Sequence, residues 1–235
     1  MFHGLFQNIT NKDKASAVEE LITHSTPNND FFLMVVLSVL MATFGLLTNS
    51  SAVIVGSMLI APILYPILSL AMGIIMSDLL LIKRALNTLA KAIILIIGAA
   101  AVVTVIFSPE VSGYTPEILS RTTPSLLFGA IGVVAGLAAS FALVKPKLSA
   151  TLPGVAISVA LIPPLSVIGI GIANFDTQII MGALLIFTIN AIGVIFTGMI
   201  VFSLMNFYAK RELAEQVVKK EEKALEHEEH KKEEK

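Results

Sequence analysis

The chain has 235 residues, of which 55% are hydrophobic and 14% are charged, and its formal net charge is −1. This composition, with a mean hydropathy of +0.85, excludes an ordinary soluble globular domain. The absence of cysteine excludes disulfides and thiolate chemistry, and the lack of a basic patch argues against a nucleic-acid partner. We therefore expect an integral protein of the lipid bilayer.

Residues 1–30 form a polar segment ahead of the apolar part of the chain. Ala15, Val18, Leu21 and Ile22 follow helical spacing, and Pro27 ends the predicted helix. We expect this amphipathic helix either to lie on the membrane surface or to pack on the ends of the transmembrane helices. The sequence leaves these two alternatives equally open.

Six apolar stretches are each long enough to cross a bilayer, which predicts an all-α, polytopic protein with six transmembrane helices. They are residues 31–48, 51–76, 85–107, 125–144, 152–173 and 178–207. Three spans in 31–107 and three in 125–207, joined by an external loop at 108–124, predict two repeats of inverted orientation. Few residues match between the halves, so this expectation depends on span count and proline depth.

Basic residues are concentrated on one side of the predicted membrane region. The two termini and the loops at 77–84 and 145–151 share that side, whereas Arg121 is the basic residue of the opposite loops. The positive-inside rule therefore predicts a cell-membrane protein with both termini in the cytoplasm. The charged tail at 208–235 is expected to form a solvated, partly frayed helix, because its apolar residues are too few for a coiled coil.

Two of the stretches carry prolines at matching depth, since Pro62 and Pro163 each lie eleven residues into their stretch. That position is roughly 16 Å deep, near the middle of a ~30 Å hydrocarbon core. Proline removes a backbone donor, so the second and fifth helices are predicted to be broken there. Broken helices in corresponding halves are typical of transporter binding sites. The predicted binding residues are Ser57, Pro62, Tyr65, Pro66, Ser158, Pro163, Pro164 and Asn190.

Packing is the alternative interpretation for the polar and small residues of the spans. Serine and glycine are common where transmembrane helices approach closely, and an isolated Asn190 often bonds one helix to another. Gly132, Gly136 and Ser140 form a stripe of small residues that predicts close helix packing, within or between protomers. On this basis we also expect a homo-oligomer.

Arg84, Asn87 and Lys91 share one helix face at the cytoplasmic end of the third span. One interpretation is a lysine that extends toward lipid phosphate. The other is an electropositive vestibule for an anionic substrate or a lipid headgroup.

The chemistry that the spans lack also limits the function. No carboxylate lies deep in any span, which disfavours proton coupling. No residue pattern predicts a metal site or a cofactor site, and His227 and His230 lie in the tail with the wrong spacing for a zinc helix. Without a catalytic constellation we expect that the protein is not an enzyme.

Three long motifs carry a family resemblance: "SSAVIVGSMLIAPILYPILSLAMGI", "PEILSRTTPSLLFGAIGVVAGLAAS" and "LPGVAISVALIPPLSVIGIGIA". In that order they resemble the bacterial and archaeal proteins of domain of unknown function 389, an uncharacterised hydrophobic membrane family. The resemblance covers about residues 31–207. It implies a multi-span architecture and names no activity.

The residues together predict a carrier or channel for a small solute or ion, with a backbone-rich site at the midplane between the two broken helices. The competing hypothesis is a non-transporting membrane scaffold, lipid-binding protein or regulatory module. In that case the Arg84, Asn87 and Lys91 face and the charged tail would be the working surfaces.

Overall fold

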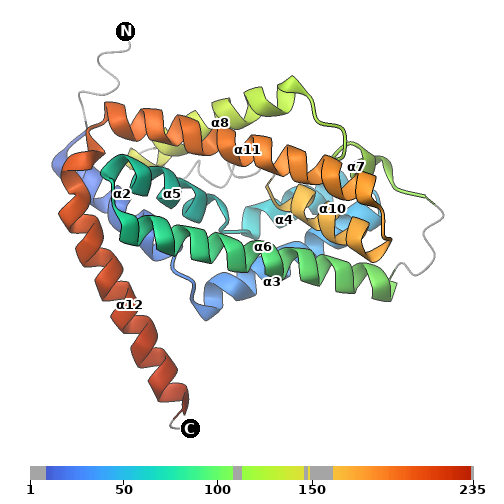
Figure 1. Ribbon diagram of the computed structural model, residues 1–235, viewed down its shortest axis with the longest axis horizontal. Coiled ribbons are helices and arrows are strands. Elements are labelled where there is room, and N and C mark those ends of the chain that lie inside the picture. Colours follow the sequence, from blue (N-terminus) through green and yellow to red (C-terminus); the bar gives the residue numbers. More distant parts are fainter. Residues whose placement is uncertain (1–8, 108–112, 146–147, 149–160, 234–235) are drawn as a thin grey trace.

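The computed structural model describes residues 9–107, 113–145, 148 and 161–233, with backbone alone for 227–233. Every regular element within these ranges is a helix, which confirms the all-α expectation for them (Figure 1). The helices are α2 (Asn11–His24), α3 (Asn29–Leu47), α4 (Ser51–Ile60), α5 (Leu64–Met76), α6 (Leu79–Phe107), α7 (Pro116–Leu119), α8 (Leu126–Val144), α10 (Ile162–Ala173), α11 (Thr177–Leu204), the 3-10 helix η2 (Phe207–Lys210) and α12 (Arg211–Glu233).

Four of these helices, α3, α6, α8 and α11, are long and apolar enough to cross a membrane. The pair α4 and α5 makes a fifth span if its two bent segments are taken together. Large apolar side chains on these helices point outward, including Ile94, Val105 and Val134, while the polar Thr88 and Ser140 are buried. Apolar outside and polar inside is the arrangement that suits contact with lipid. The predicted fifth stretch is represented by α10 alone, since 149–160 lie outside the described residues.

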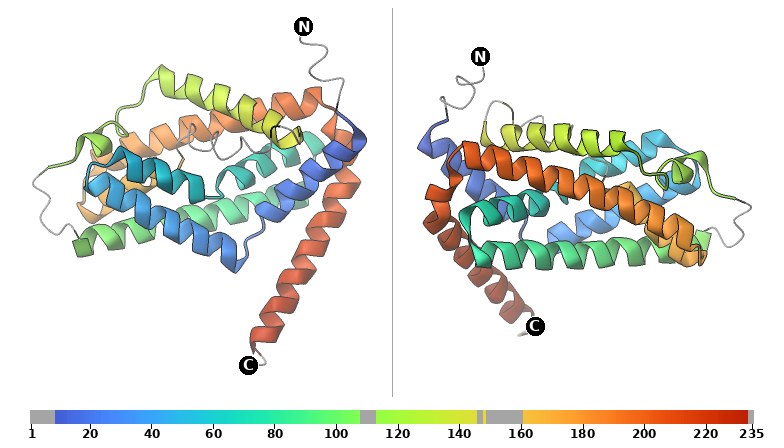
Figure 2. Two further views of the ribbon diagram at one scale, coloured as in Figure 1. Left: turned by 180° about the vertical axis from the view of Figure 1, so that it is seen from behind. Right: turned by 45° about the horizontal axis from the view of Figure 1, so that its top comes forward.

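Most of the helices run roughly along one long axis, whereas α12 projects away from one end, and the turns gather at the two ends of the bundle (Figures 1 and 2). One end holds α2, the α5–α6 turn and the start of α12. The other holds the α3–α4 turn, α7 and the α10–α11 turn (Figure 1). The loop predicted at 77–84 is wrong, because α6 begins at Leu79 and therefore includes Lys83 and Arg84.

The turn between α5 and α6 is tight and capped at both helix ends. Ser77 adopts a left-handed conformation with φ 51°, and the Asp78 amide donates to the Gly73 carbonyl at 3.0 Å. The Asp78 Oδ1 atom accepts from two amides of the first turn of α6, at 2.9 and 3.1 Å. Gly73 lacks a side chain where a Cβ would lie 3.0 Å from Ile82 Cγ1. The Asp78 cap and the close approach of Gly73 to Ile82 together allow α6 to start directly after α5.

The turn between α10 and α11 has the same construction at the opposite end of the bundle (Figure 1). Phe175 is left-handed with φ 54°, and the Asp176 amide donates to the Gly171 carbonyl at 2.9 Å. Asp176 Oδ1 accepts from two amides of α11 at 3.0 and 3.2 Å, and a Cβ on Gly171 would lie 2.8 Å from Ile180 Cγ1. The α3–α4 turn shares the glycine, Gly45, but has no side-chain cap.

Small residues bring α8 and α11 into close contact. A Cβ on Gly132 would lie 3.2 Å from the Asn190 Cα, and one on Gly136 would lie 2.7 Å from the Val194 Cα. These distances leave no room for a side chain, so the helix backbones touch. The predicted packing stripe is therefore confirmed, within the protomer.

Helix α2 packs against protein, which decides between the two alternatives for the N-terminal segment. Its Thr10–Asp13 capping box fixes its start, and its buried face packs on α5, α8 and α12. That face consists of Ala17, Val18, Leu21 and Ile22. The tail differs from expectation in its first half, where α12 is docked on the bundle through the fully buried Ala214 and Val218.

The segment that contains α7 ties together the other end of the bundle. Glu117 accepts hydrogen bonds from Ser51 at the start of α4 and from Arg121 in its own segment. The Thr115 hydroxyl donates to the Leu46 carbonyl at the end of α3, at 2.7 Å. The Tyr114 hydroxyl donates to Asp176 at the α10–α11 turn. Polar side chains thus link three helix ends here.

Candidate functional site

The second apolar stretch is broken at the predicted place. Helix α4 ends at Ile60, α5 begins at Leu64, and their axes differ by 50°. Pro62 lies between them and has no amide hydrogen, so the helical hydrogen-bond ladder cannot continue through it. The Tyr65 amide donates to the Pro62 carbonyl at 3.3 Å and restarts the helix on the far side.

Ser57 lies in the last turn of α4 and is fully buried. Its hydroxyl donates to the Ile54 carbonyl at 2.6 Å, and its own carbonyl accepts from the Ser38 hydroxyl of α3 at 2.7 Å. Carbonyls of a last helical turn lack a full set of internal donors, and Ser38 supplies one. Ser57 thus joins α4 to α3. Ser38 was not among the predicted site residues, although it is a hydroxyl in the middle of an apolar stretch.

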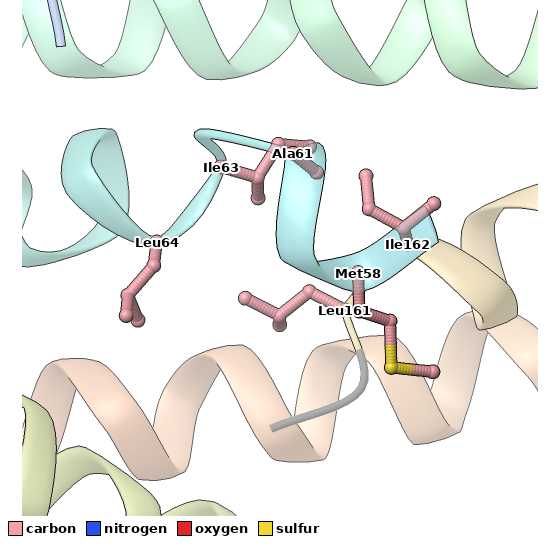
Figure 3. Close-up of a pocket in the computed structure, with 6 residues that line it drawn as sticks. All are labelled: Met58, Ala61, Ile63, Leu64, Leu161 and Ile162. Atoms are coloured by element: carbon pink, nitrogen blue, oxygen red, sulfur yellow. The ribbon is translucent and has the colours of Figure 1, made fainter. Parts of the chain in front are cut away.

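The start of α10 lies beside this break. Leu161 and Ile162 contribute to one small cavity with residues on both sides of Pro62 (Figure 3). We call it the proline cavity, and it is lined by Met58, Ala61, Ile63, Leu64, Leu161 and Ile162. Its volume is about 10 Å³, which is room for about one water molecule, and its lining is mainly apolar.

Pro163 and Pro164 are buried in the first turn of α10, where a missing amide hydrogen costs little. Ile162 is already helical, so proline does not move the residue before it out of the helix here. Ser158, predicted to match Ser57, lies outside the described residues, as do all of residues 149–160. The predicted break of the fifth helix is therefore described only from its α10 side.

None of the predicted site residues that the structure describes is among the residues that line the proline cavity, although Pro62 and Pro163 each adjoin a lining residue. Tyr65 stacks on His24 of α2, with ring centroids 4.8 Å apart, and Pro66 is buried in the first turn of α5. Asn190 is buried where α11 meets Gly132 of α8. The Tyr65–His24 contact was not predicted. In the sequence Tyr65 lies beside Pro62 and Pro66 and far from His24, and only the folded chain brings the two rings together.

Arg84, Asn87 and Lys91 are brought together at a second, larger cavity, between α6 and α12. We call it the α6–α12 cavity, and its volume is about 550 Å³. Lys83 and Leu80 of α6, Pro27, and Glu222, Leu225 and Glu226 of α12 complete its lining. The alternative hypothesis named the charged tail as a working surface, but Glu222 and Glu226 were not singled out in it. Their i, i+4 spacing, which puts both on one helix face, is the signal in the sequence.

Among the described side chains, no group of three or more histidines and carboxylates lies close enough to hold a metal ion. The tail histidines His227 and His230 fall outside the described side chains.

The long helices are apolar on the outside of the bundle and bury polar side chains inside it. The protein therefore belongs to the class of all-helical proteins that are compatible with a multi-pass arrangement in a membrane. The chain belongs to the family described as a domain of unknown function (DUF389), whose family model matches residues 58–196. It is also similar to an uncharacterised protein of Methanocaldococcus jannaschii, with 32% identity over 171 residues. That match covers 73% of this chain and 52% of the relative, so the chain spans about half the relative's length. No solved structure matches the chain.

Proposed function

We propose that this protein is a carrier or channel that moves a small polar solute or an ion across the cell membrane. The observation that carries the proposal is the shared proline cavity, where a helix broken at Pro62 faces the start of α10 with Pro163 and Pro164. Irregular backbone at membrane depth is tolerated where it faces protein or a water-filled path. Paired breaks in two halves are a recurrent design of transporter sites.

Six spans in two inverted three-span repeats are part of this proposal. The α5–α6 and α10–α11 turns support it, because the same glycine, left-handed residue and capping aspartate recur at opposite ends of the bundle (Figure 1). Inverted repeats place equivalent turns on opposite sides of a membrane. In this arrangement both termini lie in the cytoplasm, and the protein works as a homo-oligomer.

The proposed site is neutral and built from backbone. The lining residues include Met58 and Ala61 at the end of α4, Leu64 at the start of α5 and Ile162 at the start of α10. In this proposal their backbone carbonyls and amides supply acceptors and donors, whereas Pro163 and Pro164 have no amide hydrogen to donate. A cavity of about 10 Å³ is too small for a metabolite. The described conformation is therefore a closed one, and transport requires a wider conformation reached by movement at the α4–α5 break.

The test is flux into vesicles that contain the purified protein, measured over a broad panel of ions and small metabolites. We expect flux of at least one solute, and at least a tenfold loss in the double variant Pro163→Ala/Pro164→Ala, because without the proline rings a helix can continue through the predicted break. The control is Pro116→Ala at the start of α7, far from the proline cavity, which should keep wild-type flux. Absence of flux across the whole panel would reject the proposal.

A non-transporting scaffold, lipid-binding or regulatory module is the second candidate. The α6–α12 cavity favours it, because its charged residues lie away from the proline cavity. In that case neither the wild type nor the double proline variant should show flux, and the variant should have a lower thermal stability.

A further inference from the structure

Helices α6 and α12 diverge from one end of the bundle and form a wedge (Figures 1 and 2), and residues of both helices line the α6–α12 cavity. Helix α6 contributes Lys83, Arg84, Asn87 and Lys91, and α12 contributes Glu222 and Glu226. Lys83 and Lys91 are eight residues apart, which spreads the cations over about 12 Å of α6. A volume of about 550 Å³ is within the range of small-molecule sites, roughly 300–1,000 Å³.

Arg84 anchors the base of this wedge. Its side chain donates to the Val218 carbonyl of α12 at 2.9 Å and to the Thr26 hydroxyl at 2.7 Å. The residue is 9% exposed, and its Nε–H has no hydrogen-bond partner among the described residues. A buried guanidinium donor without a partner is costly, and a ligand acceptor at the cavity would remove that cost.

The two walls carry opposite charges, and Glu222 attracts the Arg84 guanidinium without a salt bridge between them among the described residues. The ion pairs of the described residues join Arg121 to Glu117 and Arg211 to Glu215, and neither involves a residue of this cavity. Cations therefore remain available on the α6 wall, and carboxylates remain available on the α12 wall. A ligand that presents a phosphate to one wall and an ammonium group to the other matches both.

The apolar surroundings favour a lipid as the source of such a ligand. Leu80, Leu225 and Pro27 line the wedge beside the charges. One turn beyond Lys91 on α6, Ile94 is 72% exposed, and Leu86 is also exposed. Acyl chains can lie along this outer face of α6 while a headgroup occupies the wedge.

We propose that the α6–α12 cavity binds a phosphoethanolamine group, as presented by phosphatidylethanolamine. The phosphate contacts Lys91, Lys83 and the Arg84 Nε–H, and the primary ammonium group donates to Glu222 and Glu226. A choline group carries the same charge but has no N–H donor, so it satisfies the carboxylates less well. This site does not depend on transport through the proline cavity.

The experiment measures binding of single lipids to the full chain purified in detergent, by native mass spectrometry. The probes are phosphatidylethanolamine, phosphatidylcholine and phosphatidylglycerol with identical acyl chains, and free phosphoethanolamine as the soluble form. We expect phosphatidylethanolamine to bind at least tenfold more tightly than phosphatidylcholine. Equal binding of free phosphoethanolamine would support the same site chemistry with a soluble source.

Variants separate the two walls, and they leave Arg84 intact because it also holds α12 in place. Lys91→Gln should weaken all three phospholipids at least fivefold. The double variant Glu222→Gln/Glu226→Gln should remove the preference for ethanolamine over choline and retain binding. Matched controls are Lys220→Gln, on the opposite side of α12 from Glu222, and Glu212→Gln, about 15 Å along the helix from Glu222. Both residues are exposed and lie outside the cavity lining, so these variants should bind as the wild type does.

Two outcomes would overturn the proposal. The first is equal binding of the three phospholipids with no effect of any cavity variant, which is the behaviour of nonspecific lipid. The second is a preference for phosphatidylglycerol that the glutamate variants do not reduce, which would define a purely anionic site.

Discussion

Ser38 and Ser57 show how the break in the second apolar stretch is tolerated. A helix end inside an apolar region leaves carbonyl groups that water cannot reach. The Ser38 hydroxyl satisfies the Ser57 carbonyl from the neighbouring helix α3. The polar residue that matters most to the break is therefore a residue of another helix.

Replacing Ser38 should measure this contribution. Ser38→Ala removes the hydroxyl that reaches α4, and we expect a loss of about 1–2 kcal/mol in the free energy of unfolding. Ser140→Ala is the matched control, because that buried hydroxyl donates to Gly136 of its own helix at 2.8 Å. Equilibrium unfolding of both variants in detergent makes the comparison, and an equal loss in both would contradict the role of Ser38.

Glycines at the contact of α8 and α11 give a second test at single residues. Gly136→Ala places a Cβ 2.1 Å from Thr197 Oγ1 and 2.7 Å from the Val194 Cα, so the backbones must separate. We expect a loss of about 1–3 kcal/mol in the free energy of unfolding. Gly98→Ala in α6 has no atom within 4 Å of the new Cβ and should be neutral or slightly stabilising. If Gly136→Ala has the same free energy of unfolding as the wild type, the contact between α8 and α11 is looser than described.

At the scale of elements, the segment around α7 fastens three helix ends with titratable side chains. Hydrogen bonds from Ser51 and from Arg121 hold the pKa of Glu117 below its usual value. Amide hydrogen bonds from the start of α11 lower the pKa of Asp176 in the same way. Burial beside Asp176 raises the pKa of Tyr114 to about 12.

These shifts predict how stability depends on pH. Carboxylates with a lowered pKa contribute stability above their unfolded values, near pH 4, and lose it as pH falls through the folded value. Tyr114 acts in the opposite direction: its contribution is complete below about pH 10 and is lost as pH rises toward 12. We expect thermal unfolding to show losses at both extremes. Tyr114→Phe should remove the alkaline loss alone, and an unchanged alkaline loss in this variant would contradict the assignment.

At the scale of the whole molecule, the position of the helix ends predicts which residues share a side of the membrane. Because the chain has no cysteine, each introduced thiol is unique. Lys12→Cys and Glu212→Cys lie at one end of the bundle and Ser120→Cys at the other. In oriented vesicles, an impermeant thiol reagent should label the first two from the same side and the third from the opposite side. Labelling of all three from one side would contradict the transmembrane arrangement.

Hydropathy predicted most of the helical architecture, because an apolar run of bilayer length satisfies its backbone hydrogen bonds most readily as a helix. It located α3, α8 and α11 to within a few residues of their ends, and Pro62 located the α4–α5 break. It misplaced the start of α6, since Lys83 and Arg84 look like loop residues until Asp78 is seen to cap the helix.

The residues of a candidate site were predictable only where they all belong to one segment of the chain. Arg84, Asn87 and Lys91 follow from spacing on one helix, but their partner wall belongs to α12, more than a hundred residues away. Tyr65 and Asn190 lie at membrane depth in the sequence and yet contact His24 and Gly132, which only the tertiary fold brings to them. Spacing along a chain does not encode contacts between distant helices.

The side-chain-free contact of α8 with α11 also has a mechanical consequence. The backbones of α8 and α11 touch along Gly132, Gly136 and Gly193 with no room for a side chain between them, so we expect these two helices to move as one unit. The break at Pro62 lies outside this pair of helices, in the bent pair α4–α5. If the protein transports a solute as proposed, widening of the proline cavity would move α4 or α5 relative to the α8–α11 pair, and the direction of that movement would decide which face of the membrane the cavity opens to.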